Sequence, residues 1–151
     1  MHEKDDFDLQ EFLPYLLNQA AEESSLAFQQ IYKHRYGMLR TEWRVLFHLG
    51  IYGELTAGEI AARARIHKTK VSRAVARLES RRFLTRSRDA ADRRREALRL
   101  TPKGESAYRD LREVARDYDA MLVEGFSEHE AELLRQMLRR LARPAADRGA
   151  A

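Results

Sequence analysis

The side chains best suited to chemistry in this sequence are cations and hydroxyls gathered between residues 68 and 77, with no carboxylate before Glu79. Long cations can neutralise phosphates, and short hydroxyls let a helix approach base edges in the major groove of DNA. The same composition would also suit a solvated basic helix face. The candidate DNA contacts are Lys68, Thr69, Lys70, Ser72, Arg73 and Arg77.

An amphipathic helix must position these side chains. Four apolar residues interleave with them at spacings i, i+3, i+4 and i+7, which predicts a helix that turns this stripe toward a core: Val71, Ala74, Val75 and Leu78. A shorter helix is expected to begin at Thr56, because Thr56 and Glu59 have the spacing of a capping box. Only a few residues separate the two helices, so the pattern is typical of a helix-turn-helix.

A β-hairpin is predicted after the second helix, with strands over residues 83 to 88 and 94 to 100. Its tip is rich in Asp and Arg and cannot form a core. A hairpin that carries arginines beside a recognition helix can enter the neighbouring minor groove. We expect Asp92 to orient an arginine and not to touch DNA itself. The candidate residues of the DNA-binding wing are Asp92, Arg93, Arg94 and Arg95.

The charge is unevenly distributed along the chain. Residues 63 to 99 contain 14 Lys or Arg and 4 Asp or Glu, a balance of +10, whereas the rest of the chain has a balance of −6. Concentration of cations on one unit is typical of a nucleic-acid-binding protein. The partner expected from charge is therefore double-stranded DNA.

Helices are expected on both sides of this unit. The sequence predicts a short helix before Pro14, a long one after it to about residue 35, and one over residues 42 to 49 that turns Trp43, Leu46, Phe47 and Leu49 inward. Beyond the hairpin, Thr101 and Pro102 should start a helix that runs to about residue 126, and Ser127 with Glu130 should cap another.

The fold class is therefore mainly α with a small β-wing, a winged helix-turn-helix flanked by terminal helices. We assign residues 1–36 and 102–143 to dimerisation helices, 37–101 to the DNA-binding unit and 144–151 to a disordered tail, all within one intertwined domain. The terminal helices have more apolar surface than a winged helix could cover, so they should pair with those of a second copy. A closed monomeric bundle is the alternative.

Composition excludes several classes of protein. With no Cys among 151 residues, a disulfide framework, a zinc knuckle and thiol redox sensing are excluded. The five His lack metal-ligand spacing, and neither a phosphate-binding Gly-rich loop nor a Ser, His and carboxylate grouping is present. We therefore expect no enzyme activity, no metal and no cofactor. Without a signal peptide or a long apolar segment, the protein should avoid membranes and stay in the cytoplasm.

The chain resembles the MarR family of bacterial transcriptional regulators through EWRVLFHLG, LTAGEIAARARIHKTKVSRAVARLE and DRRREALRLTPKG. The resemblance implies a homodimer that binds a pseudo-palindromic operator, usually as a repressor, and releases it when a small ligand binds. The family's DNA contacts fall here on Lys68, Thr69, Ser72, Arg73, Asp92 and Arg94. One departure is Arg82, which stands where the family commonly has Gly; a left-handed backbone there would cost about 1 kcal/mol.

An effector pocket is expected between the dimer arms and the DNA-binding unit, where aromatic walls and one or two cations would suit a small aromatic carboxylate or phenol. Trp43 and Phe47 could instead be core residues, and His34 with Arg35 could merely complement a helix dipole. A winged-helix module that docks an acidic protein is the alternative function. The candidate effector-binding residues are Tyr15, Tyr32, His34, Arg35, Trp43, Arg44, Phe47 and His48.

Overall fold

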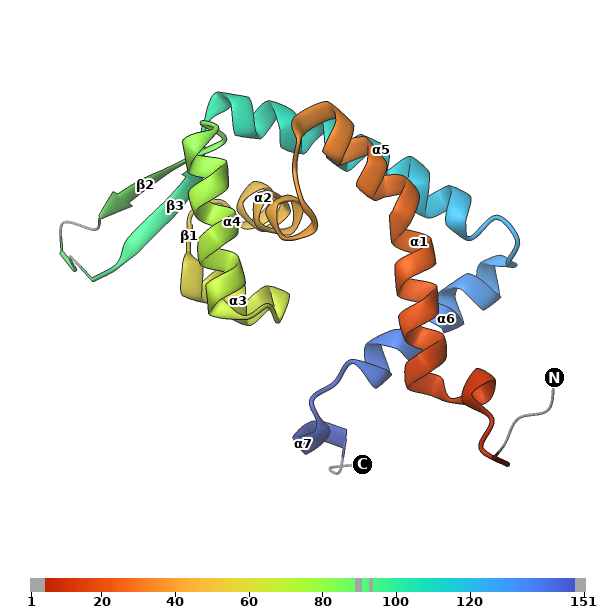
Figure 1. Cartoon of the computed structure of the whole chain (residues 1–151). Coiled ribbons are helices and arrows are strands. Elements are labelled where there is room, and N and C mark those ends of the chain that lie inside the picture. Colours follow the sequence, from red (N-terminus) through yellow and green to blue (C-terminus); the bar gives the residue numbers. More distant parts are fainter. Residues whose placement is uncertain (1–4, 89–90, 93, 149–151) are drawn as a thin grey trace. The chain divides into compact units, whose positions relative to one another are not determined.

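The computed structural model describes residues 5–88, 91–92 and 94–148. The chain divides into two compact units, residues 1–115 and 116–151. The first unit contains the winged helix-turn-helix, and the second contains the C-terminal helices (Figure 1). The mainly helical fold with a small sheet confirms the predicted fold class.

The first unit begins with the 3-10 helix η1, Leu9–Glu11, and the long helix α1, Leu13–Tyr36. Pro14 lies in the first turn of α1, where its missing N–H removes no helical hydrogen bond. Gly37 ends the helix with a left-handed backbone, φ 62°, and its N–H donates to the carbonyls of Lys33 and Tyr32. Both boundaries agree with the sequence prediction.

Helix α2, Arg40–Tyr52, is longer than predicted. Leu46 and Leu49 are buried as predicted, together with Val45 and the carboxylate of Glu42. Trp43 and Phe47, which we also expected to point inward, are half-buried and pack in an aromatic cluster. The apolar period alone did not reveal that a carboxylate would lie in the core.

The DNA-binding unit continues with β1, Leu55–Thr56, α3, Ala57–Ala64, and α4, Lys68–Ser80. The hairpin strands are β2, Leu84–Arg88, and β3, Glu96–Leu100. The three strands form an antiparallel sheet in the order β1-β3-β2, in which Leu55 pairs with Leu98 and Leu84 with Leu100 (Figure 1). Strand β1 was not predicted, because two residues are too short for an alternating pattern.

The core of the unit forms where these elements meet. Leucine, isoleucine and valine side chains from α2, α3, α4 and the sheet are almost fully buried there: Val45, Leu46, Leu49, Ile60, Val71, Val75, Leu78, Leu84 and Leu98. Gly50 of α2 lies directly against the ring of Tyr108, so any larger side chain at position 50 would collide with it. This packing fixes α4 against α2, α3 and the sheet.

Helix α5, Pro102–Leu122, begins as predicted, with the Thr101 hydroxyl accepting from the Gly104 N–H at 3.1 Å. It ends four residues before the predicted boundary. The second unit contains α6, Glu128–Leu141, whose Ser127–Glu130 capping box is present as predicted. A four-residue helix, α7, Ala145–Arg148, lies where the sequence predicted a disordered tail.

Candidate nucleic-acid interface

Helices α3 and α4 are joined by a three-residue turn. The predicted Thr56–Glu59 capping box begins α3, and Arg65 ends it with a left-handed backbone, φ 55°. His67 then caps α4, its Nδ1 accepting from the Thr69 N–H at 3.1 Å. The turn leaves the first residues of α4 exposed, as a helix that enters a DNA groove with its N-terminal end requires.

The two faces of α4 differ completely in exposure. The predicted apolar stripe of Val71, Ala74, Val75 and Leu78 is buried. All six candidate DNA contacts are exposed on the remaining surface: Lys68, Thr69, Lys70, Ser72, Arg73 and Arg77. A helix fixed on one side and covered with donors on the other can present them to phosphates and base edges.

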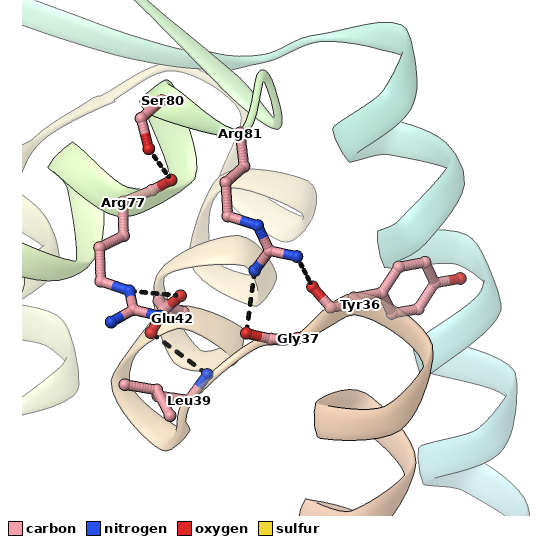
Figure 2. A network of polar contacts seen from close by, with 7 residues as sticks. All are labelled: Tyr36, Gly37, Leu39, Glu42, Arg77, Ser80 and Arg81. Carbon is pink, nitrogen blue, oxygen red and sulfur yellow. Dashed lines mark hydrogen bonds and ion pairs between the residues drawn. The ribbon is translucent and has the colours of Figure 1, made fainter.

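Arg77 has an intramolecular partner. Its Nε lies 3.4 Å from Oε1 of Glu42, an ion pair without hydrogen-bond geometry. The other carboxylate oxygen, Oε2, accepts from the Leu39 N–H at 3.2 Å. Glu42 is only 1% exposed, whereas the Arg77 side chain is 54% exposed. Arg77 thus compensates a buried carboxylate (Figure 2), and its exposed side chain still reaches solvent.

The wing presents its arginines unequally. Arg94 is exposed, and its N–H donates to Oδ1 of Asp92 at 3.0 Å. Asp92 therefore orders the backbone of the turn, whereas we expected it to orient an arginine side chain. Arg95 forms an ion pair with Glu59 of α3 at 3.0 Å, which ties the wing to the capping box. Arg93, the fourth candidate, lies outside the described residues.

Hydrogen bonds and ion pairs shift the pKa of the carboxylate that joins wing and helix. Thr56 hydrogen bonds, with a smaller contribution from Arg95, hold the pKa of Glu59 below its usual value. Glu59 therefore remains ionised at neutral pH and keeps Arg95 in place. Arg86 of β2 forms ion pairs with Glu79 of α4 at 3.0 Å and with Glu96 of β3 at 3.5 Å. Arg95 is thus engaged by a carboxylate, and Arg94 is exposed.

Arg81 and Lys103 form contacts at the end of α4 that the sequence did not reveal, and Arg82 follows with an unusual backbone. Arg81 donates to the carbonyls of Tyr36 and Gly37, and Lys103 donates to the carbonyl of Arg81 at 2.9 Å. Arg82 has φ 65°, so the left-handed backbone that we considered at the usual glycine position is present. That departure from the family pattern was the signal in the sequence for this strained turn.

The effector candidates do not converge on one place. Tyr15 precedes Tyr32 by 17 residues on the same helix, about 25 Å along its axis. His34 bonds Gln30, with 3.1 Å between Nε2 and Oε1, and Arg35 forms two 3.0 Å hydrogen bonds with Asp110 of α5. Tyr15 therefore lies far from Tyr32, and His34 and Arg35 are engaged by other side chains of the same chain.

The remaining effector candidates lie on α1 and α2. Tyr32 and Trp43 have ring centroids 5.9 Å apart, within an aromatic cluster that also holds Phe28, Phe47 and Tyr108. Arg44 donates to the Ala64 carbonyl at 2.8 Å, and burial lowers its pKa. His48 bonds the carbonyl of Arg44 at 2.6 Å. These contacts favour the core interpretation of Trp43 and Phe47.

No group of three or more His, Asp or Glu side chains is arranged to hold a metal ion in residues 5–88, 91–92 and 94–148. In the same part of the chain, no helix is long and apolar enough to cross a membrane.

The chain is similar in sequence to known transcriptional regulators. A family model described as MarR family matches residues 36–95, from the end of α1 to the wing. The HTH-type transcriptional regulator YwaE of Bacillus subtilis (strain 168) is 27% identical over 107 residues. That match spans 71% of this chain and 63% of YwaE, so it covers less than two thirds of the relative's length.

Solved structures share the fold. The MarR/EmrR family transcriptional regulator from Acinetobacter sp. ADP1 is 25% identical with a TM-score of 0.80, over 89% of this chain and 95% of that chain. Bordetella bronchiseptica BpsR, whose DNA binding is regulated by 6-hydroxynicotinic acid, is 24% identical with a TM-score of 0.78, over 87% and 98% of the two chains. The likeness to BpsR concerns the fold alone.

Proposed function

We propose that this chain is a winged helix-turn-helix regulator of the MarR family, because that family's model matches residues 36–95 and a solved MarR/EmrR regulator is similar in fold, and that it acts as a homodimeric, sequence-specific DNA-binding repressor. The observation that carries the proposal is the exposed face of α4, with six cationic or hydroxyl side chains opposite a fully buried apolar stripe. Such a protein acts on chromosomal DNA, hence in the bacterial cytoplasm at the nucleoid. The family consists of regulators and not enzymes.

The N-terminal half of α4 supplies the base contacts in this proposal. Lys68, Thr69, Ser72 and Arg73 lie within its first two turns, the part of a recognition helix that meets base edges. Lys70 and Arg77 bind phosphates on either side. Arg94 at the wing tip enters the adjacent minor groove. Arg95, held by Glu59, supports the wing and does not bind DNA directly.

A second copy of the chain covers the exposed apolar faces. In the first unit such residues gather before and at the start of α1: Phe7, Leu9, Phe12, Leu13 and Leu16. In the second unit they lie along α6: Leu133, Leu134, Met137, Leu138 and Leu141. Exposed patches of this kind mark protein interfaces. Two-fold pairing holds two recognition helices one DNA turn apart, about 34 Å, which a palindromic operator requires.

A small aromatic acid or phenol is the proposed releasing ligand. BpsR responds to 6-hydroxynicotinic acid, and Tyr32, Trp43, Arg44 and His48 provide aromatic faces and polar groups near one another on α1 and α2. Tyr15, His34 and Arg35 could contribute only from a different place or from the second copy. Release requires that the ligand bind the non-operator spacing of the dimer more tightly than the operator spacing.

The test is selection of genomic fragments by the purified protein, followed by sequencing of the retained DNA. We expect recovered sites with two inverted half-sites about ten base pairs apart, and a sedimentation mass of two chains. The alternative, a winged-helix module that docks an acidic protein, is favoured by the pairing of Arg77 and Arg95 with carboxylates.

Salt dependence separates the two functions. Phosphate neutralisation makes log affinity for DNA fall linearly with log salt, by about 0.9 per phosphate contact. A steep slope together with enrichment of one motif supports the repressor. Binding to random and selected DNA with equal affinity would refute it.

A further inference from the structure

The C-terminal end of α4 meets the junction between α1 and α2. Residues 37–39 connect these two helices, and the guanidinium of Arg81 lies against the start of this connection. Its Nη1 donates to the Gly37 carbonyl at 2.9 Å, and its Nη2 donates to the Tyr36 carbonyl (Figure 2). The two N–H groups of one planar fork therefore hold two successive carbonyls, a geometry that a lysine ammonium cannot reproduce.

The junction is shaped to receive this fork. The last carbonyls of a helix lack helical partners and carry partial negative charge, so a cation at the end of α1 satisfies both. Gly37 has a positive φ, and a Cβ at this position would lie 2.7 Å from Nη2 of Arg81. Glycine thus permits both the turn and the close approach of the guanidinium.

Neighbouring contacts hold the same end of α4. Arg77 lies one turn earlier and pairs with Glu42 in the first turn of α2. Lys103 of α5 donates to the Arg81 carbonyl at 2.9 Å. The exit of α4 is therefore attached both to the α1–α2 junction and to the start of α5, whereas the exposed contacts of its first turns lie at the opposite end.

This geometry leads us to propose that Arg81 is a positioning residue for DNA recognition: it fixes the angle of α4 against the end of α1 without touching DNA. The inference rests on the proposed function. Thr69 lies 12 residues before Arg81, about 18 Å along the helix. A tilt of roughly 5° at the Arg81 end would move Thr69 by about 1.5 Å, which is enough to break a base-edge hydrogen bond of ordinary length.

The experiment uses the full chain with Arg81→Lys, which keeps the charge but removes the fork, and Arg81→Met, which keeps only the aliphatic stem. Arg109→Met removes an exposed charge from α5 and serves as the matched control. Affinities for the selected operator and for random duplex DNA are measured from 50 to 200 mM salt, roughly the range over which phosphate contacts are resolved. Circular dichroism checks that each variant is folded.

Both Arg81 variants should lose about tenfold in the ratio of operator to random affinity, within the range of one lost base contact. Their salt slopes should equal that of the unaltered protein, and Arg109→Met should keep the full ratio. The proposal is overturned if Arg81→Lys behaves like the unaltered protein while Arg81→Met loses about 0.9 in slope, since that result describes a direct phosphate contact. An unchanged ratio in both variants, or equal weakening on both DNAs, overturns it as well.

A second measurement works without DNA, so that failure of the proposed function is distinguishable. Hydrogen exchange of residues 78–83 should be about tenfold faster in Arg81→Lys and Arg81→Met, because the tie that holds the helix end is lost. If the unaltered protein fails to discriminate operator from random DNA but this exchange difference is present, the repressor function fails and the attachment of α4 stands. Equal exchange rates in all proteins would refute the attachment itself.

Discussion

Helices α4 and α6 both have a clear apolar stripe in the sequence, but the stripe of α4 is buried in the structure whereas that of α6 is exposed. On α4 the side chains of Val71, Val75 and Leu78 are at most 1% exposed. On α6 the corresponding side chains of Leu133, Leu134, Met137, Leu138 and Leu141 are 36–48% exposed. The pattern specifies which face of a helix is apolar, but the surroundings decide whether that face is covered. The α4 stripe is therefore packed against its own unit, whereas the α6 stripe is exposed.

The largest expected effect is on the covered stripe. Leu78→Ala should lower the free energy of unfolding by about 2–5 kcal/mol, because it leaves a cavity in a fully packed core. Urea denaturation measures the change, with Ala76→Ser on the exposed side of α4 as the control. A loss below about 0.5 kcal/mol would mean that the α4 stripe is no better packed than the α6 stripe.

A substitution in the exposed α6 stripe should change the strength of dimerisation and not the stability of the single chain. Leu138→Ser is expected to weaken dimerisation by about 1.5–3 kcal/mol, the value of one buried leucine side chain, and to leave the fold of the single chain unchanged. Sedimentation equilibrium over a range of concentrations measures this, with Gln136→Ser on the same helix as the control. A dimer of unaltered strength would show that the dimer interface is a different surface from the α6 stripe. A mass of one chain at every concentration would show that no second copy covers the stripe.

Substitutions on the polar side of α4 test whether this face binds DNA. Arg73→Ala should reduce operator affinity by roughly 1–3 kcal/mol and broaden base preference at one position. Arg77→Ala should act differently, since it also removes the partner of buried Glu42 and should reduce stability. Competition binding with operator and random duplexes distinguishes them. If Arg73→Ala weakens binding equally on both, Arg73 contacts phosphate and not a base.

A smaller effect is expected in the turn that follows α4. Arg82→Gly should raise the free energy of unfolding by about 1 kcal/mol, because glycine adopts the left-handed backbone of φ 65° without a Cβ penalty. Thermal unfolding detects the gain. Arg88→Gly, within strand β2, is the control and should lower stability. A loss in Arg82→Gly would show that contacts of the arginine side chain outweigh the strain.

The smallest expected effect on stability concerns the hydrogen bond and the ion pair that connect α1 with α5. Asp110 accepts from the Tyr36 hydroxyl at 2.5 Å and pairs with Arg35. The Tyr36 hydrogen bond, followed by Arg35, lowers the pKa of Asp110 in the folded state, and burial with the same hydrogen bond raises the pKa of Tyr36 to about 12. A folded pKa below the unfolded value stabilises the protein above the unfolded pKa.

The stabilisation from Asp110 is therefore present at neutral pH and lost as pH falls below about 4 toward the lowered pKa. The contribution should stay below about 1 kcal/mol, because the pair is partly exposed and screened by solvent. Urea unfolding of Asp110→Asn across pH 3 to 7 measures it. A variant as acid-sensitive as the unaltered protein would exclude Asp110 as the cause.

Local signals explain which elements were predictable. Some signals act within four residues, so their effects are visible in the sequence. They are the capping boxes at Thr56 and Ser127, the proline in the first turn of α1 and Gly37 at the end of that helix. The buried stripe of α4 followed from its period. Strand β1 could not be predicted, because its two residues are strands only through pairing with β3.

The candidate site was predictable in composition but not in pairing. Sequence placed six donors on α4, and all six are exposed. It did not show that Arg77 faces Glu42 or that Arg95 faces Glu59, since these partners lie 35 and 36 positions away. Arg81 was overlooked for the same reason, because it binds main-chain carbonyls, which every residue has.

The sequence by itself determined the helical periods, their caps, the concentration of positive charge on one unit and the resemblance to a regulator family, because these depend on neighbours along the chain. Only the tertiary structure decided which arginines are bound to carboxylates, which carbonyls receive Arg81, and which apolar stripe stays uncovered. Those outcomes depend on groups brought together by folding, and side-chain chemistry alone does not specify which of several equivalent partners will be within reach.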